Sequence, residues 1–426
     1  MLLAAFIFWG ESIDSQICDW AVRCPFLLAG TPAIAEEPVQ PLPPSADSTL
    51  AAPPITTPPV PYTRAKAPAI AHACGPVVDG LQACVEPSTT TLSADELRQL
   101  HAKQRANRDV IPLPDWCYEY SDSWYYTRTE ACLISSGDYI IRNVETGLPV
   151  GTMHFVVWFF SFTSIYQRNW QSQVELQPVT QSGLALGSTA EGAADCVGAC
   201  TTLFHNFPPQ AAPNGATVKG DAQFETTAVN PSAVGYGTTE FRIRFKSPCC
   251  PLSSPIYSRP PVARCDNATP GRGIGCVFSD YTLAVAYSLS PTYCCPEYAR
   301  HVRDAHNSGL PGAYPSGVPL TRLTDPTLIE SNRTVACKGS YVRPAGKSCD
   351  EYPMASTWQG ARTGGGNPRS FSWCSIPQVP GGSGAAGYSV CMIVDTQNSA
   401  AGNALASFYS QNRVIDNDPF RVWIVA

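Results

Sequence analysis

Eighteen cysteines constrain this chain of 426 residues more than any other feature. They are scattered along the sequence, including the adjacent pairs Cys249–Cys250 and Cys294–Cys295, and are not gathered into the paired Cys or His clusters typical of zinc sites. An even number of dispersed cysteines predicts structural disulfides, which persist in exported proteins and are rare in the cytosol. We therefore expect a disulfide-stabilised protein that is secreted and extracellular, with metal or redox roles as the alternative.

The N-terminus is expected to be a signal or targeting segment over residues 1–35. An apolar run follows Arg23 and ends in Ala33-Ile34-Ala35, which matches an A-x-A cleavage site. Residues 36–70 are rich in Pro, Ala, Thr and Ser, a composition that cannot bury a core and predicts an extended linker or propeptide. Because no stretch reaches the roughly 18 apolar residues of a spanning helix, we expect no membrane span.

The remaining length exceeds what one hydrophobic core usually spans, so two folded units are expected. Residues 71–293 are predicted to form a β-rich, sandwich-like accessory domain, because apolar residues alternate with polar ones between Gly, Pro and Asn clusters. The stretches TEFRIRFKS and YTLAVAYSLS show this pattern. A short surface helix is predicted near the start of this domain, where Ser93 and Glu96 form a capping box.

Aromatic residues gather in one segment of this β-rich region, DWCYEYSDSWYY over residues 115–126. Such rings are typical of core and strand packing, and a ligand-stacking platform is the alternative. No catalytic cluster is apparent in the region, where His154 and His205 are isolated.

Residues 294–426 differ from the β-rich region in mixing helical and strand patterns, and they are predicted to form a second domain. A helix is expected over 296–307, a strand over 390–394, a helix over 399–409 and a final strand over 420–425. His301 and His306 are five residues apart, so they are expected on different helix faces and not as a zinc-binding pair. From Pro296 onward there are 11 Lys and Arg against 9 Asp and Glu, a net +2 within an overall charge of −6. This balance permits a polyanionic partner.

Two segments of the second domain are unlike ordinary packing sequence. In SCDEYPMASTWQGA the adjacent acids Asp350 and Glu351 follow Cys349, which a disulfide would anchor. In DTQNSAAGN a strand gives way to a small-residue helix, and Asn398 lies at the junction. Hard cations such as Mg²⁺ take one or two carboxylates plus water, and a carboxylate can also activate water for phosphodiester hydrolysis. By chemistry alone, a solvated turn with Asn398 as a helix N-cap is the favoured interpretation.

These segments, together with YARHVRDAHNSGLPG, PLTRLTD, RPAGKSCDEYP and the ending QNRVIDNDPFRVWI, resemble the NucA/NucB deoxyribonuclease family in its exported bacterial form. The resemblance covers about residues 297–426. It implies an α+β chain in which the β-rich domain precedes a small ββα-metal-type nuclease domain that cleaves DNA endonucleolytically with little sequence preference. It also implies a divalent cation, Mg²⁺ or Mn²⁺.

The family's acidic pair falls on Asp350 and Glu351, and the Asn that opens the family's helix falls on Asn398. These three residues are therefore expected to be the catalytic residues and the metal ligands, and which acid is the base stays open. Gln397 and Gln359 depart from positions where a Glu is expected, which puts the full ligand set in doubt. Candidate substrate contacts are Arg362, Arg369, Arg413 and Gln359, although each arginine is more typical of an ordinary surface.

We expect a monomer that acts on DNA without a stable protein partner. Two alternatives come from other classes. One is a non-catalytic extracellular protein that binds cell wall, glycan or DNA through the aromatic-rich region. The other is an antibacterial DNase toxin delivered into competitors.

Overall fold

The computed structural model describes residues 50–53, 55–63, 70–90, 92–102, 111–250 and 252–426, all of which belong to one compact unit, Thr49–Ala426. The predicted targeting segment, residues 1–35, lies outside the described residues, as does most of the predicted linker. In the described part of the chain, no helix is long and apolar enough to cross a membrane.

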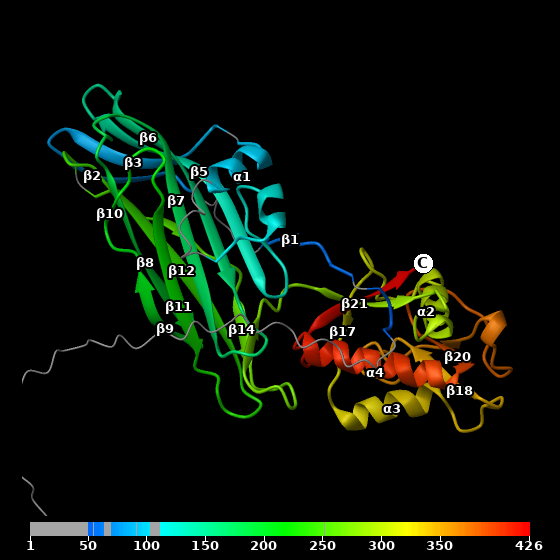
Figure 1. Cartoon of the computed structure of the whole chain (residues 1–426). Coiled ribbons are helices and arrows are strands. Elements are labelled where there is room, and N and C mark those ends of the chain that lie inside the picture. The colour runs from blue at the N-terminus through cyan, green and yellow to red at the C-terminus, as the bar shows by residue number, and fades with distance from the viewer. Residues whose placement is uncertain (1–49, 54, 64–69, 91, 103–110, 251) are drawn as a thin grey trace, which may run out of the picture. The chain divides into compact units, whose positions relative to one another are not determined.

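Two antiparallel sheets form the β-rich region (Figure 1). Among the described residues the first sheet has nine strands: β1 (Val60–Pro61), β2 (Ala73–Val78), β3 (Leu81–Pro87), β4 (Tyr125–Tyr126), β5 (Glu130–Asn143), β6 (Pro149–Phe162), β7 (Asn169–Gly183), β9 (Cys200–Asn206) and β11 (Val218–Thr226). The second has six: β8 (Thr189–Gly198), β10 (Gln210–Ala211), β12 (Val234–Lys246), β13 (Ile256–Ser258), β14 (Ala263–Asp266) and β15 (Gly275–Val277).

The two sheets pack face to face through alternating apolar side chains, as the period of two predicts. Phe241, Ile243 and Phe245 of β12 are 2%, 0% and 0% exposed, and Phe245 lies 4.8 Å from Phe155 of β6, measured between ring centroids. The outer face of the nine-stranded sheet carries a second core, to which α1 (Ala94–Ala102) and the 3-10 helix η1 (Asp115–Glu119) contribute. The sandwich-like region is therefore present, and one of its sheets is covered on both faces.

The predicted capping box of α1 is confirmed, since Glu96 accepts the backbone N–H of Ser93 at 2.8 Å and Ser93 accepts that of Glu96 at 3.3 Å. The aromatic segment is divided between packing roles. Tyr118 belongs to the outer core, Trp124 and Tyr126 belong to the inner core, and all three are buried. Core packing thus accounts for much of this segment.

The described part of the predicted linker is not a free spacer. Val60 and Pro61 pair with Tyr126 and Tyr125 as the edge strand β1, a position that tolerates proline because an edge strand need not donate on both sides. Ile70 is 2% exposed and joins the inner core.

The C-terminal region combines helices with two small sheets (Figure 1). Its helices are α2 (Pro296–Asn307), α3 (Pro326–Ala336), the 3-10 helix η2 (Ser372–Cys374) and α4 (Asp395–Gln411). Among the described residues, one three-stranded sheet contains β16 (Leu283–Ser288), β21 (Pro419–Val425) and β17 (Leu320–Thr321), and the other contains β18 (Lys347–Tyr352), β20 (Tyr388–Val394) and β19 (Pro368–Arg369).

The strand β16 differs from expectation in its partner. Its sequence, within YTLAVAYSLS, predicts a sandwich strand, but it pairs in parallel with β21, Leu283 opposite Phe420. Five of its six residues are buried, which is typical of a parallel strand covered on both faces. The C-terminal region therefore begins before residue 294 in structural terms.

Disulfides join the cysteines of the described part of the chain into eight pairs, which confirms the structural interpretation for these residues. Cys18 and Cys24 lie outside the described residues. The pairs are Cys74–Cys84, Cys117–Cys132, Cys196–Cys200, Cys249–Cys250, Cys265–Cys276, Cys294–Cys295, Cys337–Cys349 and Cys374–Cys391.

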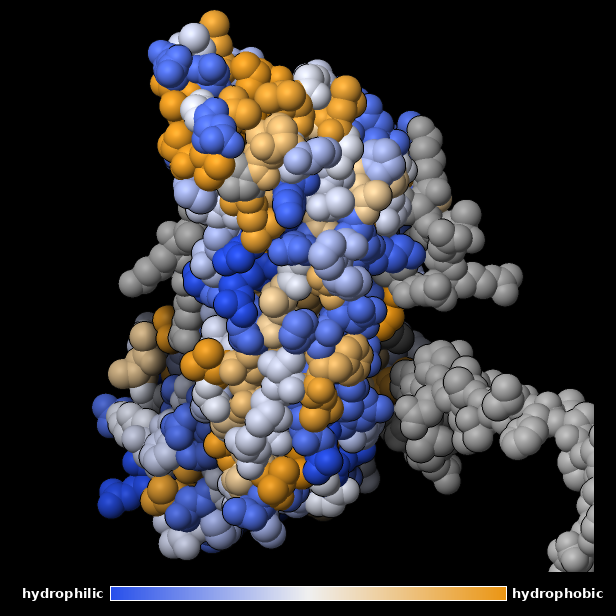
Figure 2. All heavy atoms as spheres, turned by 90° about the vertical axis from the view of Figure 1, so that its left-hand side faces the viewer, coloured by the Kyte–Doolittle hydropathy of each residue, from blue (hydrophilic) through white to orange (hydrophobic). Residues whose placement is uncertain are grey.

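Apolar side chains also lie exposed on three neighbouring turns at one end of the sandwich. Backbone hydrogen bonds join these turns, from Val144 N–H to the Gly80 carbonyl and from Leu184 N–H to the Val150 carbonyl. Leu148 and Leu186 are 64% and 57% exposed there. Figure 2 shows apolar atoms gathered at this end of the face it presents, the end where the β2–β3 and β5–β6 turns lie in Figure 1.

Candidate active site

The strand β18 and the helix α4 bring Asp350, Glu351 and Asn398 to one cleft of about 1290 Å³, which all three line. The disulfide Cys337–Cys349 ties β18 to the end of α3 directly beside the acids. β18 also pairs with β20, Asp350 standing opposite Cys391 of a second disulfide. One disulfide therefore fixes the strand that carries the acidic pair, and a second fixes its partner strand β20.

Asn398 lies in the first turn of α4 and is not its N-cap, since the helix begins at Asp395 after Val394. Its amide nitrogen donates to Ser348 Oγ at 3.0 Å and to the Cys349 carbonyl at 3.2 Å. This contact binds the helix to β18 and leaves the amide oxygen as an acceptor beside the acids. The N-terminal turn of a helix also carries a partial positive charge, which favours anions.

Asp350 is held by a histidine from α2. Its Oδ2 lies 2.5 Å from Nδ1 of His301, and Nε2 of His301 lies 2.9 Å from Ser389 Oγ on β20. His301 is fully buried, and Asp350 is 5% exposed. The contact fixes one carboxylate oxygen of Asp350, a residue that also lines the cleft. Sequence analysis placed His301 on a helix but did not pair it with the acids.

Glu351 has a strongly shifted acidity. Burial, reinforced by the neighbouring charge of Asp350, raises its pKa to about 7, against the opposing influence of Arg333 and the backbone N–H of Ala355. A carboxyl group with a pKa near neutrality can both accept and release a proton at physiological pH, as a general base requires.

Two arginines that sequence analysis did not single out line the same cleft, Arg322 and Arg333. The guanidinium carbon of Arg322 lies 3.8 Å from the ring centroid of Tyr409, which fixes its orientation. With Asp350, Glu351 and Asp416, the charged residues that line the cleft sum to −1. Such a cleft attracts cations, and its arginines supply phosphate donors once the acids are neutralised. Arg322 lies within the segment PLTRLTD, which sequence analysis quoted, so this signal was available.

The structure places the four candidate substrate residues outside the lining of this cleft. Gln359 accepts the backbone N–H of Thr321 at 2.9 Å and so ties its loop to β17. Arg362 is exposed. Arg369 is 4% exposed and donates to the carbonyls of Ser308, Gly384 and Ala386, while burial lowers its pKa.

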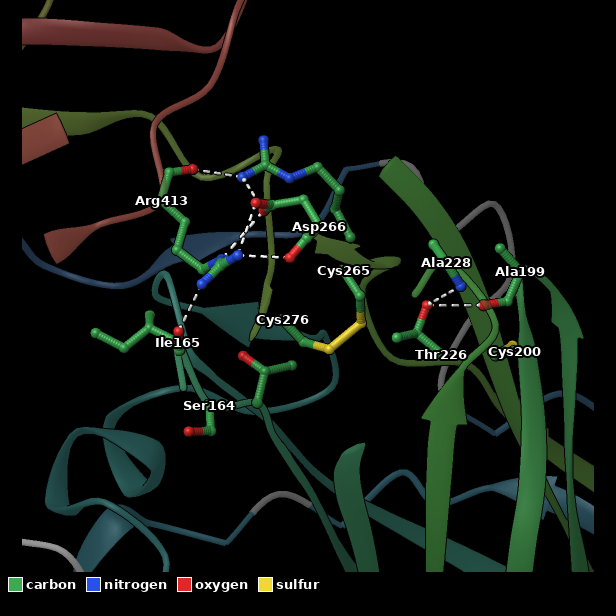
Figure 3. The surroundings of a disulfide bond; sticks show 12 residues. Ser164, Ile165, Ala199, Cys200, Thr226, Ala228, Cys265, Asp266, Cys276 and Arg413 are labelled. Carbon is green, nitrogen blue, oxygen red and sulfur yellow. Dashed lines mark hydrogen bonds and ion pairs between the residues drawn. A yellow bond between two sulfur atoms is a disulfide. The ribbon is translucent and has the colours of Figure 1, made fainter. Parts of the chain in front are cut away.

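Arg413 is fully buried in an ionic cluster and does not reach a phosphate. Its Nη2 donates to Asp266 Oδ1 at 2.8 Å and its Nη1 to the Ile165 carbonyl at 2.8 Å, beside the disulfide Cys265–Cys276 (Figure 3). Arg413 therefore ties the C-terminal region to strands of the sandwich.

The same cluster includes Arg264, which donates to Asp418 at 2.5 Å, and Arg128, which donates to Asp418 at 3.0 Å. Burial and the charge of Arg264 lower the pKa of Arg128 to about 10, opposed by Asp418. Three guanidinium groups and two carboxylates thus share the site, and backbone carbonyls accept several further donors, although the buried Nε of Arg264 has no hydrogen-bond partner among the described residues. This cluster, defined as Arg128, Arg264, Asp266, Arg413 and Asp418, is called the junction cluster below.

Gln397 also points away from the cleft. Its side-chain oxygen accepts the backbone N–H of Glu297 at 2.7 Å in the first turn of α2, and Glu297 in turn accepts the backbone N–H of Val394 at 2.9 Å. The residue that stands where a Glu is expected therefore joins the starts of two helices.

The donor set suits a hard divalent cation. Two carboxylates and an amide oxygen are oxygen ligands of the kind that Mg²⁺ and Mn²⁺ prefer, and these ions keep several waters. Among the residues that the structure describes, no group of three or more His, Cys, Asp or Glu side chains is placed to hold a metal. Asp350 and Glu351 supply only two such side chains, so an ion held by them and Asn398 would have to complete its shell with water.

Comparison with known families matches residues 329–423 to the model of deoxyribonuclease NucA/NucB. The cleft acids, Asn398 and the strand β20 lie within this stretch. The resemblance that the motifs predict is therefore confirmed over residues 329–423, which match the NucA/NucB deoxyribonuclease family model. Searches of curated proteins and of solved structures found no match.

Proposed function

We propose that this protein is a secreted, metal-dependent endodeoxyribonuclease that hydrolyses DNA phosphodiester bonds with little sequence specificity. The observation that carries the proposal is that Asp350, Glu351 and Asn398 line one cleft inside the stretch matched by the deoxyribonuclease family. The disulfide pairing of the described cysteines supports export.

Asp350, Glu351 and Asn398 would hold a divalent cation, Mg²⁺ or Mn²⁺. When bound, such an ion polarises a phosphate oxygen and stabilises the leaving oxygen. The order β18, β20, α4, with antiparallel strands followed by the helix, supports a ββα-metal type of site. The strands are joined by the long connection 353–387 and not by a tight turn.

Side chains that line or adjoin the cleft supply the proton acceptor, the positioning contact and the phosphate donors. Glu351, with its pKa near neutrality, accepts the proton of the attacking water on its carboxylate. His301 positions Asp350 through the 2.5 Å contact. Arg322 and Arg333 donate to the phosphate from the wall of the cleft. None of these contacts reads a base, which accords with low sequence preference.

The test is digestion of supercoiled plasmid by purified protein with Mg²⁺ or Mn²⁺, with EDTA, and with the ion restored. We expect nicking and then fragmentation, arrested by EDTA. Asp350→Asn and Asn398→Ala should each lower the rate at least about 100-fold. Asn403→Ala is the matched control, because Asn403 is exposed on the same helix and does not line the cleft.

Full activity in EDTA would contradict metal dependence. Wild-type rates in both variants would show that the site lies elsewhere. DNA binding without cleavage would favour the non-catalytic alternative.

A further inference from the structure

A second cleft lies on the outer face of the nine-stranded sheet and shares no lining residue with the candidate active site. It has a volume of about 490 Å³, within the range of small-ligand sites. Its floor is formed by β7 and β11, and β6 and β9 flank them.

The strand register aligns side chains in two rows across these four strands. In the first row Phe162 stands opposite Gln171, Gln171 opposite Gln223, and Gln223 opposite Phe204. Because directly opposed residues share a face, two phenyl rings flank a pair of amides. Phe204 is 45% exposed.

The second row adds polar groups on the same face. Gln173 stands opposite Asp221, and Asp221 opposite Asn206. The Asn206 side chain hydrogen-bonds to the Asp221 carboxylate, and both side chains are exposed. Lys219 also lines the cleft, so its charge and that of Asp221 cancel.

Two glutamines hold the walls in place. Gln173 donates to the Ile111 carbonyl at 2.6 Å and accepts the Ile111 N–H at 3.2 Å. Gln210 donates to the Lys219 carbonyl at 2.7 Å and accepts the Lys219 N–H at 3.1 Å. Because these amides are engaged by backbone, the cleft has a fixed frame around Gln171, Asn206 and Asp221.

The chemistry of this face selects one ligand class. Amides offer one donating and one accepting arm and a carboxylate accepts, a combination that matches hydroxyl groups that both donate and accept. The exposed ring of Phe204 and the half-buried ring of Phe162 match an apolar C–H face. A nucleic acid would need several cations, and the lining of this cleft offers one lysine and one acid. A purely apolar ligand would leave the amides without partners.

We propose that this cleft binds a neutral oligosaccharide, with Phe204 and Phe162 stacking on sugar rings and Gln171, Asn206 and Asp221 bonding to hydroxyls. The β-rich region then attaches the protein to a glycan surface. This proposal stands independently of the nuclease activity.

The test is affinity electrophoresis and titration calorimetry of the full chain with soluble neutral glycans: hydroxyethylcellulose, mannan, dextran and chitohexaose. We expect at least one of these to bind. Phe204→Ala and Asp221→Ala should each weaken that binding at least 10-fold. Leu203→Ala is the matched control, because Leu203 is 48% exposed on the same strand and does not line the cleft.

Gln171→Ala provides a second variant should Phe204→Ala not fold, which circular dichroism would reveal. Plasmid digestion should stay at the wild-type rate in all these variants, which separates this site from the nuclease site. Three outcomes would each overturn the proposal. The protein binds none of the four glycans, or Gln171→Ala and Asp221→Ala bind the glycan as tightly as the wild type does. The third is that the protein binds single-stranded DNA at this cleft, shown by loss of that binding in Phe204→Ala.

Discussion

Two groups of buried ionisable residues, the junction cluster and the cleft acids, use their charges in opposite ways. In the junction cluster, Arg413 and Arg264 donate to carboxylates and to several backbone carbonyls. In the cleft, Asp350 and Glu351 are adjacent like charges, and the nearest cationic influence on Glu351 is Arg333. A structural cluster is thus paired within itself, whereas the cleft keeps charge that a ligand must neutralise.

The largest expected effect tests the cleft half of this comparison. Glu351→Gln keeps the shape of the side chain and removes the proton acceptor, so we expect plasmid hydrolysis to fall about 10²- to 10⁴-fold. The measurement is the initial rate of plasmid hydrolysis by Glu351→Gln with Mg²⁺, compared with the rates of the wild type and of the control Asn403→Ala. A change of less than twofold would remove Glu351 from the mechanism.

The same variant should gain stability. Because burial raises the pKa of Glu351 in the folded protein from its ordinary value of 4.5 to about 7, wild-type stability is greatest at low pH and falls as the pH rises between these values. Above pH 7 in EDTA, Glu351→Gln should therefore be more stable by on the order of 3 kcal/mol. Urea unfolding at pH 5 and pH 8 measures this, and a loss of stability would mean that the cleft acid is structural, which breaks the comparison.

The second effect tests the junction cluster. Arg413→Met leaves Asp266 buried with one fewer partner, so unfolding should cost about 3–5 kcal/mol less. Denaturant unfolding of wild type and variant gives this difference. Arg362→Met is the control, because Arg362 is exposed and should change stability by under about 0.5 kcal/mol. Equal stabilities of wild type and Arg413→Met would show that the cluster is not needed for stability.

The third effect concerns His306, whose Nε2 lies 2.7 Å from the hydroxyl of Tyr352 beside the acidic strand. Burial lowers its pKa from 6.5 to about 4. The unfolded chain therefore binds more protons between these values, and stability is lost as the pH falls from about 6.5 to 4, by on the order of 3 kcal/mol in total. His306→Gln should show a flatter dependence over that window in urea unfolding. An unchanged slope would mean that other groups cause the acid sensitivity.

Much of the fold follows from local patterns. The helix predicted over 296–307 matches α2, since Pro296 suits a first helical position and Gly309 and Pro311 follow the helix. The helix α4 begins four residues before the expected start at 399, because Asp395 to Asn398 continue it toward β20. The helix α3 was not predicted, although its Asp325 cap and Pro326 are typical start signals. Its weak apolar period explains the omission.

Partners far apart in sequence could not be predicted from local patterns. β16 pairs with a strand more than a hundred residues later, and Asp350 pairs with His301 on another element. Likewise, Arg413 has an ordinary local sequence and gains its role from Asp266. The motif predicts which residues matter at the cleft, and tertiary structure decides which neighbours position them.

The smallest expected effect concerns Gln397, which stands where the family pattern leads us to expect a Glu. It tests whether this residue is structural, like the junction cluster, or functional, like the cleft acids. Gln397 lies one position before Asn398, yet its side chain caps the first turn of α2 through Glu297. Gln397→Ala should therefore lower the free energy of unfolding by about 1 kcal/mol, as the loss of a helix cap does. Plasmid hydrolysis should change less than twofold, in contrast to Asn398→Ala, because Gln397 does not line the cleft.

Denaturant unfolding and initial rates of the two neighbouring variants, with Asn403→Ala as control, separate the outcomes. A loss of rate in Gln397→Ala that matches Asn398→Ala would place Gln397 among the ion ligands. Gln397 would then have a functional role like that of Asn398, and not only a structural one. The predicted result instead gives two neighbouring amides of one helical turn different roles. Gln397 binds the start of α2, and Asn398 binds the acidic strand β18.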